Sequence, residues 1–515
     1  MKSKKGNSGN VDCFLMMINE FEDLLSQKHV IVDREQLFPL EQTTFATTHM
    51  IAAVILPANT EEVLKCVRIA AKYNMPVYPI SRGKNWGNGA KVPTQNNCVL
   101  MDLSRMNAVV DFHEELAYVT IEPGVTQGQI IEFLRQKKSA LTMSMTGSSL
   151  DSSVVGNVLE RGDSAGSYGE RCHYVCGFEV VLATGEVIHT GFKRFANASC
   201  GALHRAGLGP SLDGLFVQSN FGIVTQMTLW LEPTAKHVHH LFLPIDDEKK
   251  LADVISILHQ LFLKGIFQNI TIWSDHKLFS RMQQYPYEQT QDQTPLPELV
   301  RISLQKKYGI KRWTACITLV SFYDNQAQAQ IDVMRQSLQS LVPDLEICKD
   351  AYVDNSLGGS RENVSLAYWR KKQKPSPELD LDHDKCGLIW CMLLVPFSGK
   401  DVTAALSMIE AICMQHGFES NIAITGTQTR TLKILSAIIY DREVPLEDEK
   451  AMACHDDLMT QLISKGYLPY RLGVQSMWVM NSADDDCKAV WSRLKDVFDP
   501  KHILSPGRYA FNSNP

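Results

Sequence analysis

The chain has 515 residues, of which 44% are hydrophobic and 21% are charged, as is ordinary for a globular protein of about two to four domains. Its formal net charge of -6 does not indicate the broad basic face of a nucleic-acid-binding protein. No apolar run reaches the about 20 residues that a membrane-spanning helix needs, so we expect no membrane segment.

The cysteines indicate a reducing compartment. There are 13 of them, scattered and odd in number, so we expect reduced thiols in a cytoplasmic enzyme. Cys172 and Cys176 are spaced CxxxC; a redox or metal pair stays open, although two buried thiols beside a strand are favoured. The stretch "HVHH" at 237–240 has no cysteine or carboxylate at a convincing spacing, so we predict no metal site and interpret it as a solvated strand end.

The first strong element signal lies at residues 57–80. Thr60 is predicted to cap a helix whose first turn holds two glutamates. Pro76 ends that helix, and Val77 to Ile80 is predicted to be a short buried strand. A second strand, turn and helix follow, with the helix beginning at about Gln127.

Further along the chain, two strands are predicted to meet at a tight turn over Ala183 to Glu186. The alternating segment "GIVTQMTLWLEP" is predicted to be a strand that stops at Pro233. After Pro233 the short strand-like segments give way to longer helical patterns, which predicts a domain boundary near residue 235. The last stretch, "VFDPKHILSPGRYAF", is expected to return to the first domain.

The loop in "PVYPISRGKNWGNGA", residues 76–90, is a candidate anion site. Its glycines allow positive φ and a close backbone approach, successive amides can form a nest, and Arg82 and Lys84 add charge. This chemistry suits a diphosphate, although an ordinary surface turn stays open on this loop alone. Neither a P-loop nor a Rossmann motif is present in the chain. Two more tracts rich in small residues follow, at 145–186 and 207–233.

Taken in order, these segments resemble the vanillyl-alcohol oxidase and p-cresol methylhydroxylase family, and within it the 4-phenol oxidases. The resemblance rests on "PISRGKNWG", "SSVVGNVLERG", "GFEVVLATGEVIHTG", "DGLFVQSNFGIVTQMTLWLEP" and "ILSPGRY". It implies an α+β fold: an FAD-binding domain of two subdomains with an inserted α+β cap, or substrate, domain. The implied limits are 1–235 for the FAD-binding domain, 236–470 for the cap and 471–515 for the C-terminal return.

The resemblance also implies which residues hold the FAD cofactor. The first loop is expected to line the pyrophosphate, and the two later tracts to follow the flavin. The implied cofactor-binding residues are Ser81, Arg82, Gly83, Lys84, Asn85, Trp86, Ser153, Gly156, Asn157, Gly222 and Ile223.

Three residues match the family's catalytic positions. Glu170, in "YGE" where the family has "YGD", is the acid/base candidate, and Tyr470 with Arg471 is expected to stabilise a phenolate or carboxylate. A surface glutamate and a structural arginine stay open as alternatives. Asn88 stands where the family has a second phenol-binding tyrosine, so it joins Tyr470 and Arg471 as a substrate-binding candidate. The family's set of phenol-binding side chains is therefore incomplete in this chain.

The family often attaches FAD covalently through a histidine or tyrosine of the cap. The corresponding stretch, 427–442, contains no histidine, and Lys433 and Ile434 stand near the expected position. We therefore predict non-covalent FAD, with Tyr440 as a remote alternative that is expected to pack in the core.

The favoured function is an FAD-dependent oxidoreductase that transfers a hydride to flavin N5. A tailoring dehydrogenation or oxidative decarboxylation in secondary metabolism is preferred. A 4-alkylphenol or vanillyl-alcohol-type oxidase and a catalytically silent flavin-fold binding protein are the alternatives. The expected partners are a small organic substrate and dioxygen or another electron acceptor, in a homodimer that binds neither nucleic acid nor membrane.

Overall fold

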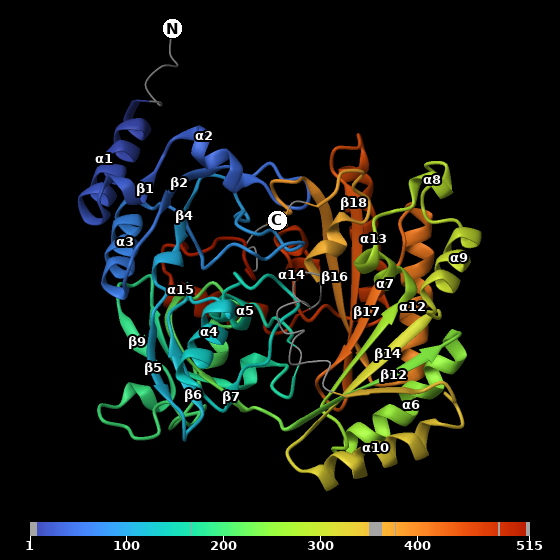
Figure 1. The fold of residues 1–515 in the computed structure, drawn as a ribbon. Coiled ribbons are helices and arrows are strands. Elements are labelled where there is room, and N and C mark those ends of the chain that lie inside the picture. The colour runs from blue at the N-terminus through green and yellow to red at the C-terminus, as the bar shows by residue number, and fades with distance from the viewer. Residues whose placement is uncertain (1–7, 165, 350–362, 376, 483–484, 511–515) are drawn as a thin grey trace.

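The chain forms two halves that lie side by side in the computed structural model (Figure 1). The structure describes residues 8–164, 166–349, 363–375, 377–482 and 485–510. Two sheets from the first 235 residues make up the left half of the view. A third sheet and its helices make up the right half. The predicted α+β class is confirmed.

The first sheet combines parallel and antiparallel strands. In sheet order its strands are β1 (Val30–Ile31), β2 (Ile51–Ile55), β4 (Cys98–Asp102) and β3 (Val77–Ile80). Helices α1 (Ser8–Leu25) and α3 (Thr60–Tyr73) pack together beside it, and the short α2 (Arg34–Leu37) precedes β2. The strand predicted at Val77 to Ile80 is confirmed.

The predicted cap of α3 is wrong by one residue. Asn59, not Thr60, is the N-cap, and its side chain accepts a hydrogen bond from the backbone nitrogen of Glu62 at 2.9 Å. The Thr60 hydroxyl instead donates to Glu179 at 2.6 Å and ties the helix to the second sheet. Both residue types cap helices well, so local sequence alone did not separate them.

The second sheet is antiparallel. Its order is β5 (Val109–His113), β6 (Tyr118–Ile121), β10 (Ile223–Trp230), β8 (Val175–Val181) and β9 (Val187–His189). Helices α4 (Gln127–Lys137) and α5 (Val154–Leu159) share its buried core, and β7 (Leu141–Thr142) pairs with β11 (Glu232–Pro233). The predicted helix start at Gln127 and the turn between β8 and β9 are confirmed. Cys176 is buried in β8, and burial raises the pKa of its thiol to about 12.

The last described segment lies against the first sheet. The backbone nitrogen of Val77 donates to Ile503 at 2.7 Å, and that of Ser505 donates to Val77 at 2.8 Å. Nearby, the Lys495 ammonium of α15 (Lys488–Phe498) bonds Asp499 at 2.7 Å. The last segment is thus part of the first half, as expected, while the domain limits themselves stay a prediction.

The third sheet, which we call the cap sheet, has seven strands within the described chain. Its antiparallel order is β15 (Glu346–Lys349), β12 (His237–Ile245), β14 (Trp313–Ser321), β13 (Asn269–Ser274), β17 (Asn421–Gly426), β18 (Thr431–Asp441) and β16 (Cys386–Pro396). One face shares a buried core with α6 (Glu248–Leu263), α10 (Asp324–Leu338), α12 (Gly399–Gln415) and α13 (Glu447–Ser464).

Successive residues of a β-strand point to opposite faces of the sheet. On β14, Ala315, Ile317 and Leu319 join the helix-covered core, while Cys316, Thr318 and Val320 face a cavity. The other cap strands alternate in the same way. The cap sheet therefore has one face covered by helices and one face that forms a wall of the cavity.

The remaining α-helices of the described ranges are short. They are α7 (Asp275–Met282), α8 (Tyr287–Thr290), α9 (Glu298–Tyr308) and α14 (Val479–Ser482). Helix α7 packs against β13 and β17. No helix in the described ranges combines the length and apolar character needed to cross a membrane.

The solvated strand end predicted for "HVHH" is wrong. His237, His239 and His240 are each less than 10% exposed in β12, because β14 and β15 pair with this strand on either side. His240 lies on the cavity face. Three histidines among four residues look polar in the sequence, but neighbouring strands far along the chain bury them.

Candidate active site

A cavity of about 990 Å³ lies between the first half of the chain and the cap sheet. That volume is at the upper end of the range for cofactor and ligand sites, about 300–1,000 Å³. The three tracts of small residues all contribute to its wall, together with residues of β12, β13, β14, β16, β17 and β18. The structure thus brings together segments that lie hundreds of residues apart.

All the predicted cofactor-binding residues line this cavity. So do the substrate-binding candidates Asn88, Tyr470 and Arg471, whereas Glu170 is not among the lining residues. Direct contact of each lining residue with the cofactor stays a prediction.

The glycines of the first loop meet two separate demands. Gly83, Gly87 and Gly89 have φ of +62°, +74° and +112°, a region that side chains disfavour. A Cβ on Gly87 would lie 2.3 Å from the Trp390 ring of the cap sheet. Gly87 therefore lets the cap approach the loop, a packing role that sequence reasoning did not foresee.

The second tract is fixed by the N-cap of α5. The Ser153 hydroxyl accepts from Gly156 nitrogen at 2.9 Å and donates to the carbonyl of Pro123 at 2.6 Å. A Cβ on Gly156 would lie 3.3 Å from the hydroxyls of Ser153 and Ser81, so the first and second tracts meet here. In the third tract, a Cβ on Gly222 would clash with Val180 at 2.6 Å, so core packing alone requires this glycine.

Buried polar atoms without partners test whether the cavity fits FAD. Among the described residues, Arg471 Nε, Arg508 Nη1 and Asn88 Oδ1 are buried and have no hydrogen-bond partner, although all three residues line the cavity. Such atoms are rare unless a ligand or water satisfies them. Two donors and one acceptor suit a cofactor rich in phosphate and carbonyl oxygens with ring N–H groups, so the cavity fits FAD.

Tyr470 and Arg471 lie side by side at the cap end of the cavity. One Arg471 nitrogen donates to the Asn85 side chain of the first loop, which fixes the guanidinium. Burial, reinforced by the Asp163 charge, raises the pKa of Tyr470 to about 12, and the nearby Arg471 and Lys433 only partly offset this. Tyr470 therefore stays protonated at neutral pH and can act as a hydrogen-bond donor.

Lys433 is the centre of a buried ion cluster behind Tyr470. Its ammonium lies 3.0 Å from Asp163, 2.9 Å from Glu170 and 5.2 Å from the centre of the Tyr470 ring. Burial lowers the pKa of Lys433, but the Asp163, Tyr470 and Glu170 groups outweigh it and leave the pKa raised. The cluster ties β18 of the cap sheet to the loop after α5.

The two carboxylates of this cluster differ in access. Asp163 lines the cavity and also accepts from the Thr425 hydroxyl at 2.8 Å. Glu170 lies behind Lys433, where Gln428 also donates to it and His173 is 3.5 Å away. Sequence reasoning therefore missed the carboxylate that faces the cavity, although Asp163 stands in the small-residue tract seven positions before Glu170.

None of the three positions considered for covalent attachment, Lys433, Ile434 and Tyr440, is among the described residues that line the cavity. Lys433 is held in the ion cluster, and Ile434 packs in the cap core. The Tyr440 hydroxyl donates to Asp448 at 2.8 Å, and Tyr440 is absent from the cavity wall, so its expected core position is confirmed. Non-covalent FAD stays a prediction: acid-precipitated protein is expected to lose its yellow colour, and a pellet that stays yellow would contradict this.

Family models match two parts of the chain. The model described as "FAD binding domain" matches residues 51–191, and the one described as "FAD linked oxidases, C-terminal domain" matches residues 472–509. Both matches include cavity-lining segments. The protein is an FAD-linked oxidoreductase.

Curated relatives and solved structures narrow the class. The chain is 40% identical to 1'-carboxy-chondrochloren decarboxylase of Chondromyces crocatus, over 95% of this chain and 96% of that one. It is 26% identical to the 4-cresol dehydrogenase [hydroxylating] flavoprotein subunit of Pseudomonas putida, over 97% and 96%.

Two solved structures share the fold over nearly the full length. One is p-cresol methylhydroxylase with substrate bound, with a TM-score of 0.91, 24% identity and 99% of each chain covered. The other is 4-ethylphenol oxidase from Gulosibacter chungangensis, with a TM-score of 0.87, 25% identity and 98% of each chain covered. The chain therefore belongs to the vanillyl-alcohol oxidase and p-cresol methylhydroxylase family of flavoproteins, which the sequence motifs had indicated.

Proposed function

We propose that this protein oxidises a carboxylic acid in a tailoring step of secondary metabolism, by dehydrogenation or oxidative decarboxylation. The main support for this proposal is the positive charge of the cavity wall on its cap side. Lys277 and Arg471 line it, whereas the carboxylates among the described lining residues already bond other groups. Glu160 pairs with Arg508, Asp163 with Lys433, and Glu232 accepts from Ser144.

A wall with this excess of positive charge favours an anionic substrate. The 40% identity to a protein named as a decarboxylase supports an acid as that substrate. Bound FAD supplies a hydride acceptor, so that loss of a hydride from the carbon next to the carboxylate-bearing carbon, together with CO₂, leaves a carbon–carbon double bond and a reduced flavin.

The chain's own residues then bind and orient the substrate. We assign Arg471, fixed by Asn85, to hold an oxyanion through its unpartnered Nε, and the protonated Tyr470 hydroxyl to donate a second hydrogen bond. Asp163 is the carboxylate that can accept a proton from a substrate in the cavity. Glu170 is assigned to position Lys433, because its carboxylate lies 2.9 Å from that ammonium and is absent from the cavity wall.

An oxidase for 4-alkylphenols is the second candidate. The Tyr470–Arg471 pair favours it, since both side chains can stabilise a phenolate, and so does the similarity to a cresol dehydrogenase subunit. Asn88 in place of a tyrosine weighs against it, because its unpartnered side-chain oxygen only accepts hydrogen bonds and its amide nitrogen already donates to Asn85 within the loop at 3.4 Å.

Anaerobic flavin reduction separates the two candidates. The holoprotein is mixed under nitrogen with 3-(4-hydroxyphenyl)propanoate, 4-ethylphenol or vanillyl alcohol, and the absorbance at 450 nm is followed. We expect the acid to bleach the flavin and the neutral phenols to react much more slowly. Rapid bleaching by 4-ethylphenol, with no reaction of the acid, would establish the phenol oxidase instead.

The reaction also needs an electron acceptor, and we propose dioxygen, with another acceptor as the alternative. Oxygen consumption during turnover tests this directly. We further propose a homodimer, which light scattering of the purified holoprotein tests.

A further inference from the structure

Lys277 is a cation buried in the cavity wall. Its side chain is 4% exposed, and its ammonium lies 4.8 Å from the centre of the Trp390 ring. Within the described ranges, no carboxylate pairs with this ammonium. A buried charge without a partner is costly, and such a group in a cavity indicates a binding role.

Burial and a neighbouring charge both act on the pKa of Lys277. Burial, with a smaller contribution from the Arg281 charge, lowers the pKa of Lys277 to about 7. Both influences disfavour the ammonium form, and no carboxylate of the described residues counters them, in contrast to Lys433. An anion placed in the cavity beside Lys277 would restore the charged form.

The base of α7 holds Lys277 in place. Ser274 caps the helix by accepting from the Lys277 backbone nitrogen at 3.2 Å. Asp275, fully buried, accepts from Arg301 at 2.7 Å and from Arg312 at 2.9 Å.

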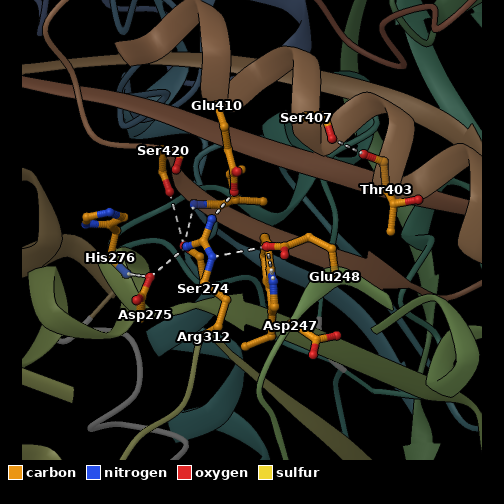
Figure 2. Close-up of polar contacts among 12 residues, drawn as sticks. Asp247, Glu248, Ser274, Asp275, His276, Arg312, Thr403, Ser407, Glu410 and Ser420 are labelled. Carbon is orange, nitrogen blue, oxygen red and sulfur yellow. Dashed lines mark hydrogen bonds and ion pairs between the residues drawn. The ribbon is translucent and has the colours of Figure 1, made fainter. Parts of the chain in front are cut away.

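Figure 2 shows Arg312 between Asp275, Glu248 and Glu410. These charges pair with one another, and none of the four residues lines the cavity. The ion pairs immobilise the first turn of α7, and a rigid helix presents the Lys277 side chain to the cavity with little loss of conformational entropy on binding.

The position of Lys277 differs from the site expected for the FAD pyrophosphate. The Lys277 ammonium lies over the ring of Trp390, and the backbone N–H of Trp390 donates to the carbonyl of Gly87 at 3.2 Å. Lys277 thus lies over the ring of a cap-sheet residue that itself packs against Gly87 of the loop. Arg82 and Lys84 provide charge for the pyrophosphate within the loop itself.

We infer that Lys277 binds the carboxylate of the substrate and so determines the enzyme's preference for acids over their neutral analogues. The inference rests on the proposed function, since it names the group that recognises the acid. An ammonium beside an indole ring offers charge and an apolar surface together, which suits a carboxylate on an organic skeleton.

Equilibrium binding to the holoprotein tests the inference. The probes are 3-(4-hydroxyphenyl)propanoate and its amide, which share a phenol and differ in charge at the other end. Binding is read from the change in the flavin spectrum. We expect the unmodified enzyme to bind the acid about 10- to 100-fold more tightly than the amide, as for a charge-assisted hydrogen bond.

Lys277→Met should abolish this preference by weakening the acid alone, while Lys277→Arg, which keeps the charge, should retain most of it. Lys307→Met is the matched control, since Lys307 also lies over an aromatic ring, Tyr308 at 4.7 Å, but on the exposed surface. An unchanged FAD content and spectrum show that each variant folds.

Three results would overturn the inference: an acid preference that survives in Lys277→Met, an equal weakening of acid and amide, and an unmodified enzyme that does not prefer the acid. An equal weakening would indicate that Lys277 binds the phenol end. The proposed function fails separately, if the acid binds with the expected preference but neither bleaches the flavin nor releases CO₂.

Discussion

Replacing Asp382 by asparagine is predicted to stabilise the protein at neutral pH. The Asp382 carboxyl accepts from the Trp86 indole of the first loop at 3.1 Å, and its other oxygen is buried without a partner within the described chain. Burial raises the pKa of Asp382 from 3.8 to about 6, the neighbouring Asp380 adds to this, and Trp86, Lys91 and Lys84 oppose it.

The sign of the effect follows from linkage. A carboxyl whose pKa is raised in the folded state binds its proton more tightly there, so its protonation stabilises the fold at low pH. That stabilisation is complete below about pH 3.8 and is lost as the pH rises through about 6. A shift of about two pKa units corresponds to about 3 kcal/mol at 1.36 kcal/mol per unit.

Asparagine keeps the acceptor for Trp86 and carries no charge. Asp382→Asn should therefore gain up to about 3 kcal/mol over the unmodified protein above pH 6, and nothing near pH 4. Melting temperatures measured in excess FAD at several pH values test this, with Asp332→Asn on the exposed surface of α10 as the control. A difference that does not depend on pH would refute the reasoning.

Three further predictions concern the cavity. Arg471→Ala should lower turnover by about 10²- to 10³-fold, the usual loss of an oxyanion donor, while FAD content stays unchanged; normal turnover would remove Arg471 from the mechanism. Gly83→Val should lose FAD, because φ is +62° and the new Cβ would lie 2.4 Å from Lys91. Gly417→Val is the control and should keep FAD, since Gly417 is also at positive φ but in open space. FAD retained in Gly83→Val would contradict the assignment of the loop. Asp163→Asn should lower turnover by about 100-fold or more and Glu170→Gln by less than about tenfold, and the reverse order would restore Glu170 as the acid/base.

Much of the first half of the fold could be predicted because its signals are local. Pro76 fixes where one strand can begin, and the helix from Gln127 follows a threonine that forms a capping box. The cap of α3 was missed because Asn59 and Thr60 are both good caps, and only the distant Glu179 draws Thr60 away. The histidines of β12 were misjudged for a similar reason, since only strand pairing with β14 and β15 reveals their burial.

The candidate site divides in the same way. The small-residue tracts could be found because glycine and serine signal close backbone approach wherever they occur. Lys277 could not, because a lysine in "SDHKLF" reads as an ordinary helix residue until tertiary packing buries it. Asp163 was overlooked for the same reason: its importance depends on Lys433, 270 residues further along the chain.

A crystal structure of the holoprotein with 3-(4-hydroxyphenyl)propanoate is the most direct test of the account. We predict a flavin whose pyrophosphate lies along residues 81–86, with the acid between the flavin ring and the cap sheet and its carboxylate within hydrogen-bond distance of Lys277. A flavin held elsewhere, or an acid bound away from Lys277 and Arg471, would contradict the account.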